Sequence, residues 1–412
     1  MPDIDTANTP RLSASNRGNR LTEVAGLFLR LGFTAFGGPA AHIAMLRDEV
    51  VHRRKWISDE RFIDLMGIAS IIPGPTSTEL AIYVGYLRAG WPGLVLAGVC
   101  FILPAMIIVL ALAWAYVTYG ALPQIGWLFY GIQPVVVAII AVALWNLSRT
   151  LLKGIWPVLF ALALLILYLS GINVLIILFG GGLLYGLGSW AQQSRMGKNK
   201  MTGLSLLPLS SWHAGWKATA TAILGGGAAG AATVNLWALF LTFLKYGAVV
   251  YGSGYVLLAF LRTDLVQNLH WLTDQQLLDA ISVGQFTPGP VFTTATFIGY
   301  LIGSWPGAVL ATVGIFLPSF ILILLVHPVA ERLRASTLTA PLLKGINIAA
   351  IALMGGVLVQ LAQHAFTDVL TVALALISFA ILVRFKLNSV WLILLGALIG
   401  LLRFGVVSLL HL

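Results

Sequence analysis

The stretch Ile72-Pro73-Gly74-Pro75-Thr76 decides the fold of this 412-residue chain, because its tripeptide returns at Pro288-Gly289-Pro290 in a matching apolar setting. The two copies lie 215 residues apart (288 minus 73), and the same offset aligns many residues upstream of them. Downstream the offset becomes 214, and it aligns Trp91-Pro92-Gly93 with Trp305-Pro306-Gly307. A correspondence of this length predicts two homologous halves.

Pro-Gly-Pro cannot continue a helix, because each proline lacks an amide hydrogen and the residue before a proline avoids the α region. Gly37-Gly38-Pro39 interrupts the first apolar segment in the same way, and Gly252-Ser253-Gly254 interrupts its counterpart in the second half. Within a bilayer, broken backbone is tolerated only where protein buries it or water reaches it. Paired breaks in two halves are therefore typical of a transporter's substrate site.

The composition predicts a multi-pass membrane protein. Hydrophobic residues make up 59% of the chain, charged residues only 9%, and the mean hydropathy is +0.94. Cys100 is the single cysteine, which excludes a disulfide within the chain, and no metal site is expected. The net charge of +10 would suit nucleic acid, but the basic residues lie in short loops, where the positive-inside bias explains them. We therefore expect a lipid bilayer around the chain and no nucleic-acid partner.

We predict an all-α polytopic fold with two inverted homologous repeats, broken or re-entrant helices and about 10–13 membrane segments. The short apolar segments 64–72 and 76–87 are expected to form a re-entrant pair, because crossing the bilayer takes about 20 helical residues. The full spans of the first half are expected at 91–116, 125–147, 151–169 and 172–190. The predicted parts are a polar N-terminal tail (1–20), a first repeat (21–190), a basic linker (191–233) and a second repeat (234–412). An extra crossing at 219–234, and with it the side of the N-terminus, stays open.

Loop charges indicate that the second half is inverted. Arg88, Arg149 and Lys153 mark cytosolic loops in the first half, whereas Ile302 takes the position of Arg88 in the second half. The basic residues of the second half fall in loops whose first-half equivalents are external: Arg332, Arg334, Lys344, Arg384 and Lys386.

Two cations lie at equivalent depths in the apolar segments, Arg30 and Lys245 (30 plus 215). Each is expected about 12–14 Å into the membrane, from a rise of 1.5 Å per residue. A cation there is costly and often marks a substrate path, so this pair predicts a two-sided clamp for an anion. The alternative is that both side chains snorkel to an interface.

Backbone N–H groups freed at the breaks, together with the positive ends of the helices that follow, suit an oxyanion. The alternative is that the glycines only permit close helix packing. Glu79 is the one acid of the re-entrant pair and a candidate for proton coupling, although Thr76 and Glu79 also fit a capping box. For Asp64 and Asp279, a first-turn position near an interface is the favoured interpretation. We expect helix–helix hydrogen bonds to satisfy single polar groups such as Gln133.

These motifs resemble the chromate ion transporter family, in the type with two fused halves. The resemblance rests on the runs 31–39, 73–79, 245–255 and 286–290 and covers nearly the whole chain; Ser253 departs from a more uniformly Gly-rich motif. It implies a chromate exporter of the bacterial inner membrane that confers chromate resistance, driven by the membrane potential or a proton gradient.

The substrate-binding residues are then expected at the breaks: Gly37, Gly38, Pro39, Gly252, Ser253, Gly254, Pro73, Gly74, Pro75, Thr76, Pro288, Gly289 and Pro290, with Arg30 and Lys245. Sulfate, a tetrahedral dianion of similar size, is the rival substrate. An intramembrane enzyme or lipid-phosphate binder is the rival class, but the sequence carries no nucleotide loop, nucleophile elbow or catalytic carboxylate pair. We expect a transporter without cofactors and not an enzyme, and a homodimer stays open.

Overall fold

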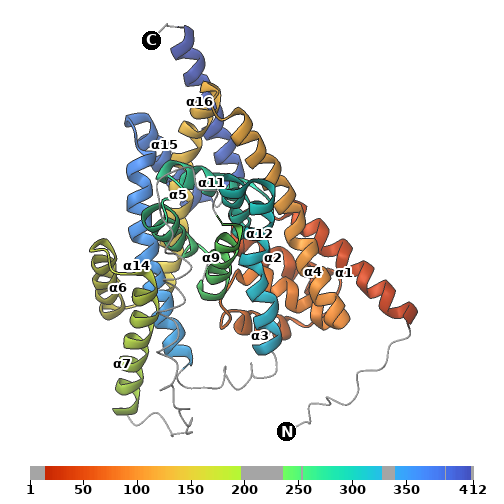
Figure 1. Cartoon of the computed structure of the whole chain (residues 1–412). Coiled ribbons are helices and arrows are strands. Elements are labelled where there is room, and N and C mark those ends of the chain that lie inside the picture. The colour runs from red at the N-terminus through yellow and green to blue at the C-terminus, as the bar shows by residue number, and fades with distance from the viewer. Residues whose placement is uncertain (1–13, 196–234, 252–253, 327–338, 386, 410–412) are drawn as a thin grey trace.

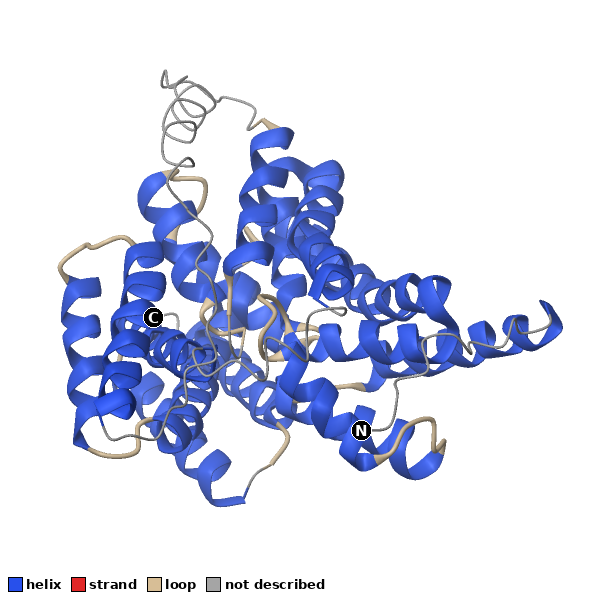
Figure 2. Ribbon diagram, turned by 90° about the horizontal axis from the view of Figure 1, so that it is seen from below, coloured by secondary structure: helices blue, strands red, loops and turns tan. Residues whose placement is uncertain are grey.

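The computed structural model describes residues 14–195, 235–251, 254–326, 339–385 and 387–409, and every regular element within these ranges is helical. Figure 2 shows helices joined by short loops. The all-α prediction is confirmed. The segment 219–234, for which an extra crossing was left open, lies outside the described residues, as do Gly252 and Ser253.

The elements of the first repeat follow the expected order. They are α1 (Ala14–Thr34), α2 (Gly38–Arg47), the π-helical η1 (Asp48–Arg53), α3 (Asp59–Ala69), α4 (Thr76–Tyr119), α5 (Pro123–Leu151), α6 (Ile155–Leu169), the π-helical η2 (Ile176–Gly180) and α7 (Gly181–Arg195). Because α1 begins at Ala14, it extends into the segment expected as a polar tail.

The second repeat contains the counterparts at the expected offsets. They are α9 (Leu236–Val249), α10 (Leu257–Leu261), the π-helical η3 (Arg262–Asn268), α11 (Asp274–Phe286), the 3-10 turn η4 (Val291–Thr293), α12 (Thr294–Val326), α14 (Thr339–Ala365), α15 (Val369–Phe385) and α16 (Ser389–Leu409). The equivalent helices α4 and α12 end at opposite ends of the molecule (Figure 1), as inverted repeats require.

A sharp turn divides each of the two longest helices. In α4, Ala89 (φ −139°, ψ 18°) and Gly90 (φ 66°, ψ −150°) leave the helical region, and Gly303 and Ser304 do so in α12. Residues on either side of this turn pack closely, since a Cβ on Gly85 would overlap backbone of the segment after the turn. Residues 76–88 therefore fold back on the start of 91–119 as a short, non-spanning helix.

The two repeats interlock through their last helices. In the first repeat α5 packs against α15 and α16 of the second, and α14 of the second packs against α6 and α7 of the first. Glycines make the closest approaches at equivalent positions: Gly131 lies against Gly396, and Gly345 lies against Gly182. Small residues of this kind let membrane helices approach to backbone contact.

The helices have the length and composition of a multi-pass membrane protein. Within the described residues, five are long and apolar enough to cross a bilayer: Thr76–Tyr119, Pro123–Leu151, Val291–Val326, Thr339–Ala365 and Ser389–Leu409. Shorter apolar helices pack beside them, and apolar side chains cover much of the exposed surface, as lipid contact requires.

The close packing of α5 on α16 yields a stability prediction. Gly131→Ala would drive a Cβ into the carbonyl oxygen of Gly396, whereas Gly126 on the same helix has no atom within 4 Å of that position. We expect Gly131→Ala to lower the stability of the detergent-solubilised protein by about 2 kcal/mol through overpacking, and Gly126→Ala to leave it unchanged. Thermal melting followed by intrinsic fluorescence measures this, and equal melting temperatures for the two variants would contradict the interlocked packing.

Candidate functional site

The two Pro-Gly-Pro breaks are held by hydrogen bonds exchanged between the repeats. The N–H of Gly74 donates to the carbonyl oxygen of Val250 at 2.7 Å, and the N–H of Gly289 donates to that of Ala35 at 2.8 Å. Ala35 and Val250 are themselves equivalent, 215 residues apart (250 minus 35). Each break therefore depends on a carbonyl group beside the other repeat's first interrupted helix.

The geometry at Gly74 admits only glycine. Its φ of 138° lies in a region that side chains rarely adopt. A Cβ there would also lie 2.5 Å from Oε1 of Glu79 and 2.5 Å from Oγ of Ser319. The break thus brings an acid of α4 and a hydroxyl of α12 to one point.

Helix N-termini from both repeats converge at a small cavity of about 20 Å³. Its lining comes from three of the predicted breaks and from residues directly after Pro75 and Pro290: Pro39, Pro75, Thr76, Ser77, Gly254, Val291 and Phe292. The helix α2 begins at Gly38, α4 begins at Thr76, and η4 leads into α12 from Val291. Unsatisfied N–H groups and positive dipole ends at such termini attract anions.

A larger cavity of about 570 Å³ adjoins this point and shares Pro39 with it. Phe36, Gly37 and Tyr255 line it near the breaks. It is also lined by polar residues from the last part of α5 and from the junction where α16 begins: Asn146, Asn388 and Ser389. Sequence reasoning missed these three polar residues, because only the α5–α16 packing brings them together.

The structure brings most of the predicted break residues to this region. Pro39 lines both cavities, Gly37 lines the larger one, and Pro75, Thr76 and Gly254 line the smaller one. The remaining described residues of the Pro-Gly-Pro motifs are buried around them: Pro73, Gly74, Pro288, Gly289 and Pro290. Their contact with a substrate stays a prediction.

Arg30 and Lys245 are not unpaired cations. Arg30 donates to Oε1 of Glu49 at 2.6 Å, and Lys245 pairs with Asp264, which is the equivalent of Glu49. Their side chains are 53% and 41% exposed in the absence of lipid, and neither lines the two cavities. Glu49 and Asp264 were missed, although the 215-residue offset relates them and would have found them (264 minus 49). A role of the two cations toward the substrate stays a prediction.

A second duplicated ion pair lies next to the first in each repeat. Arg47 donates two hydrogen bonds to Asp59 at 2.7 and 2.6 Å, and Arg262 donates to Asp274 at 2.7 Å. The hydrogen bond from Arg47 lowers the pKa of Asp59 below its usual range. These pairs fasten each interrupted helix to the start of α3 or α11, which sets the position of the breaks.

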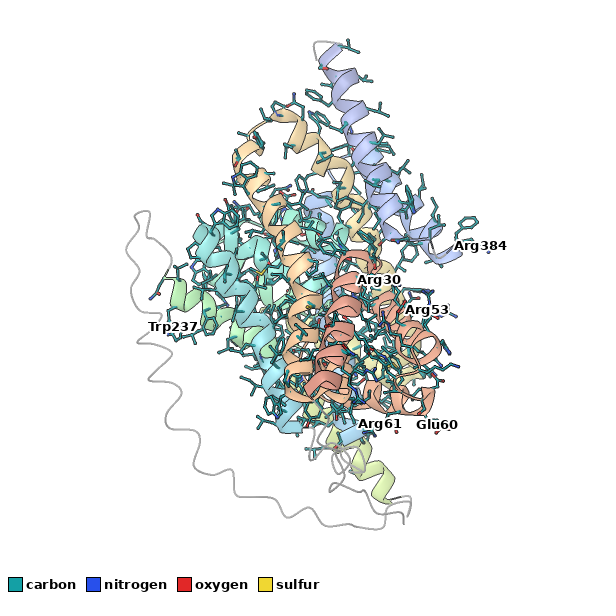
Figure 3. The ribbon with its side chains drawn as sticks, turned by 90° about the vertical axis from the view of Figure 1, so that its right-hand side faces the viewer. Arg30, Arg53, Glu60, Arg61, Trp237 and Arg384 are labelled. Atoms are coloured by element: carbon teal, nitrogen blue, oxygen red, sulfur yellow. The ribbon has the colours of Figure 1, made fainter. Side chains whose placement is uncertain are left out.

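The first-repeat cluster carries extra positive charge. Besides Arg30, Glu49 also accepts from Arg53 at 3.2 Å and from Arg54 at 3.3 Å. The equivalent of Arg53 in the second repeat is the neutral Asn268, which donates to Asp264 at 3.3 Å. Figure 3 shows Arg30, Arg53 and Arg384 on one side of the molecule and Trp237 on the opposite side. The first-repeat cluster around Glu49 therefore carries more positive charge than the equivalent cluster around Asp264. This difference in charge agrees with opposite orientations of the two repeats under the positive-inside rule.

The capping-box interpretation of Glu79 is wrong. The N-cap of α4 is Pro75, no side chain caps this helix, and Thr76 is its first residue. Proline cannot offer a side-chain acceptor, so Glu79 has no capping partner to exchange bonds with. Its two carboxyl oxygens are buried without a hydrogen-bond partner among the described residues.

The first-turn interpretation of Asp279, and of its equivalent Asp64 in α3, is also wrong. Asp279 is only 3% exposed and lies beyond the first turn of α11, which begins at Asp274. Its carboxylate accepts from Tyr116 at 2.8 Å and from Gln133 at 2.8 Å. The prediction that helix–helix hydrogen bonds satisfy Gln133 agrees with this contact, which ties α11 to α4 and α5.

Two interlocked repeats, each with helices broken at membrane depth, and N-termini that meet at the breaks define a membrane transporter. A family model described as "Chromate transporter" matches residues 22–187 and 237–401, one segment in each repeat. The chain belongs to the chromate transporter family. This is a family of transporters, as the sequence predicted, and not a class of enzymes.

Curated relatives are similar over most of the chain. The chromate transport protein of Cupriavidus metallidurans is 33% identical over 93% of this chain and 93% of its own. The probable chromate transport protein of Synechococcus elongatus is 32% identical, over 87% of this chain and 88% of its own. For the chromate transport protein of Pseudomonas aeruginosa the identity is 32%, with 92% and 91% covered. No solved structure matches the chain.

The ion pair between Lys245 and Asp264 gives a prediction that distinguishes a purely structural role of Lys245 from a contact between Lys245 and the substrate. Lys245→Asp places two carboxylates together and should lower both thermal stability and transport. Adding Asp264→Lys restores the pair, and we expect the double variant to recover about 1 kcal/mol of coupling energy. If the double variant recovers stability but not transport, Lys245 contacts the substrate. A coupling energy of zero would contradict a stabilising ion pair between Lys245 and Asp264.

Proposed function

We propose that the chain is a secondary transporter of the bacterial inner membrane that exports chromate from the cytoplasm and thereby confers chromate resistance. The observation that carries this proposal is the convergence of helix N-termini from both repeats at the Pro-Gly-Pro breaks. Backbone N–H groups there suit an oxyanion with four acceptor oxygens, and a dry site strengthens the attraction. The names of the curated relatives support chromate over sulfate.

The larger cavity supports loading from the cytoplasm. Asn146 is followed on α5 by Arg149, and Asn388 follows Arg384 at the end of α15. These basic residues come from different repeats, and each was assigned to the cytosolic face by its own loop charges. The cavity between them therefore faces the cytoplasm in this proposal.

The small cavity supports alternating access. A volume of about 20 Å³ holds about one water molecule, which is less than a tetrahedral oxyanion needs. The breaks must separate to admit the anion, and the exchanged hydrogen bonds at Gly74 and Gly289 couple the two repeats during that motion. An inside-negative potential drives a dianion outward, at roughly 2.3 kcal/mol per charge for each 100 mV. The proposal needs one chain only, since both repeats are present in it.

Flux into everted vesicles tests the function. Vesicles with the chain should accumulate radiolabelled chromate when the potential is inside-positive, and excess sulfate should compete only weakly. Gly74→Ala should abolish the uptake at equal membrane abundance, because its Cβ would collide with Glu79 and Ser319. Gly126→Ala, which meets no atom within 4 Å, is the matched control. Uptake of sulfate in preference to chromate would favour the sulfate alternative, and no flux of either would overturn the proposal.

Cysteine labelling tests the direction of the cavity. In a Cys100→Ala background, single cysteines at Asn146 and Asn388 should react with a membrane-impermeant maleimide in everted vesicles. The same reagent should label neither position in intact cells with a permeabilised outer membrane. Bound chromate should slow the reaction at both positions. Labelling of either position from outside would contradict loading from the cytoplasm.

A further inference from the structure

Glu79 is a buried acid without a partner at the first Pro-Gly-Pro break. It is 0% exposed, and neither carboxyl oxygen has a hydrogen-bond partner among the described residues. The hydroxyl of Ser319, also 0% exposed and without a partner, lies at the same point beside Gly74. Thr76 and Ser77, on the same turn of α4, line the small cavity where the helix N-termini meet.

The two protonation states of Glu79 suit two states of this region. An ionised carboxylate that is fully buried and unpaired is strongly destabilised, so the closed arrangement around Glu79 suits the neutral acid. The positive end of α4 favours a negative charge close by. A substrate dianion and an ionised Glu79 would repel each other at short range in a medium of low dielectric constant. The anion-loaded region therefore suits the neutral acid as well, and the ionised acid suits a state in which the breaks have separated, water reaches Glu79 and no anion is present.

The second repeat has no counterpart of this acid. Thr293 and Thr294 occupy the equivalent positions, and their hydroxyls donate to the carbonyl oxygens of Pro290 and Val291, each at 2.8 Å. The equivalent of Ser319 is Ala105 (319 minus 214). The repeats are thus alike in backbone at the breaks but differ in side-chain chemistry, and Glu79 has no acidic counterpart in the second repeat.

The surroundings of Glu79 leave its charge uncompensated. From the segment between α9 and α10, Tyr251 lies within electrostatic range of the carboxyl group. The described part of α12 carries no charged residue. Other titratable groups on the neighbouring elements have contacts of their own: Arg30 with Glu49, His42 with the carbonyl of Ala35, and Asp279 with Tyr116 and Gln133. Asp64 and Tyr83 also have an interaction.

We propose that Glu79 is a proton-binding site linked to the oxyanion site. When the breaks separate without an anion, Glu79 is ionised; it takes one proton from water when the dianion enters the breaks and releases it to water when the anion leaves the open site. Each dianion therefore crosses with one proton, and the net charge moved is one negative charge. This inference rests on the proposed function, because it needs an anion at the breaks.

Proton uptake on anion binding tests the link. The purified full-length chain is mixed with radiolabelled chromate, or with sulfate, in weak buffer at a pH where both are dianions. Bound anion is measured by equilibrium dialysis and proton uptake by a pH-indicating dye. Above the pKa of Glu79 in the anion-free protein, we expect proton uptake to approach one per bound anion and the affinity to fall about tenfold per pH unit.

Variants separate Glu79 from other acids. Glu79→Gln should bind chromate without proton uptake and with an affinity independent of pH, and Glu79→Thr, which copies the second repeat, serves if the first variant does not fold. Glu60→Gln removes an exposed carboxylate and copies Gln275 of the second repeat, so it should behave as wild type. Wild-type binding without proton uptake, or full uptake in Glu79→Gln, overturns this inference alone. Absence of bound chromate and sulfate in wild type overturns the proposed function as well.

Discussion

An amide hydrogen that lacks an acceptor is costly inside a bilayer, and the arrangement of this protein depends on how two such groups are satisfied. Gly74 and Gly289 interrupt helices at membrane depth, and each finds its acceptor at the interrupted helix of the other repeat. The exchange fixes the relative position of the four breaks. Residues at or next to all four breaks then line one small cavity.

The sequence predicted the features that local chemistry controls. Pro-Gly-Pro has no helical conformation available to it, so the breaks could be placed without a structure. The reversal near Leu87 followed from a segment too short to span, and the backbone turns at Ala89 and Gly90. The repeat was visible because glycines, prolines and tryptophans at constrained positions keep their spacing. Together with the family resemblance, these signals gave the fold class.

Three features were not predicted from the sequence, each for a different reason. Asn146 and Asn388 lie 242 residues apart (388 minus 146), and only the antiparallel contact of α5 with α16 brings them to one cavity. The capping box failed because Pro75, not Thr76, takes the N-cap position. Glu49 was missed for a different reason: depth along a helix identified Arg30 as costly, but that depth says nothing about an acid on the next element.

The exchanged hydrogen bonds also constrain how such a chain can arise. A single repeat inserted alone would leave the Gly74 amide without its acceptor, and its α5 would lack the cover that α16 provides. A half-length ancestor could therefore fold only against a second copy inserted in the opposite direction. Gene fusion makes that pairing permanent at a fixed one-to-one ratio. It also allows one half to carry an acid at position 79 while the other carries threonine at the equivalent position, which two identical subunits could never do.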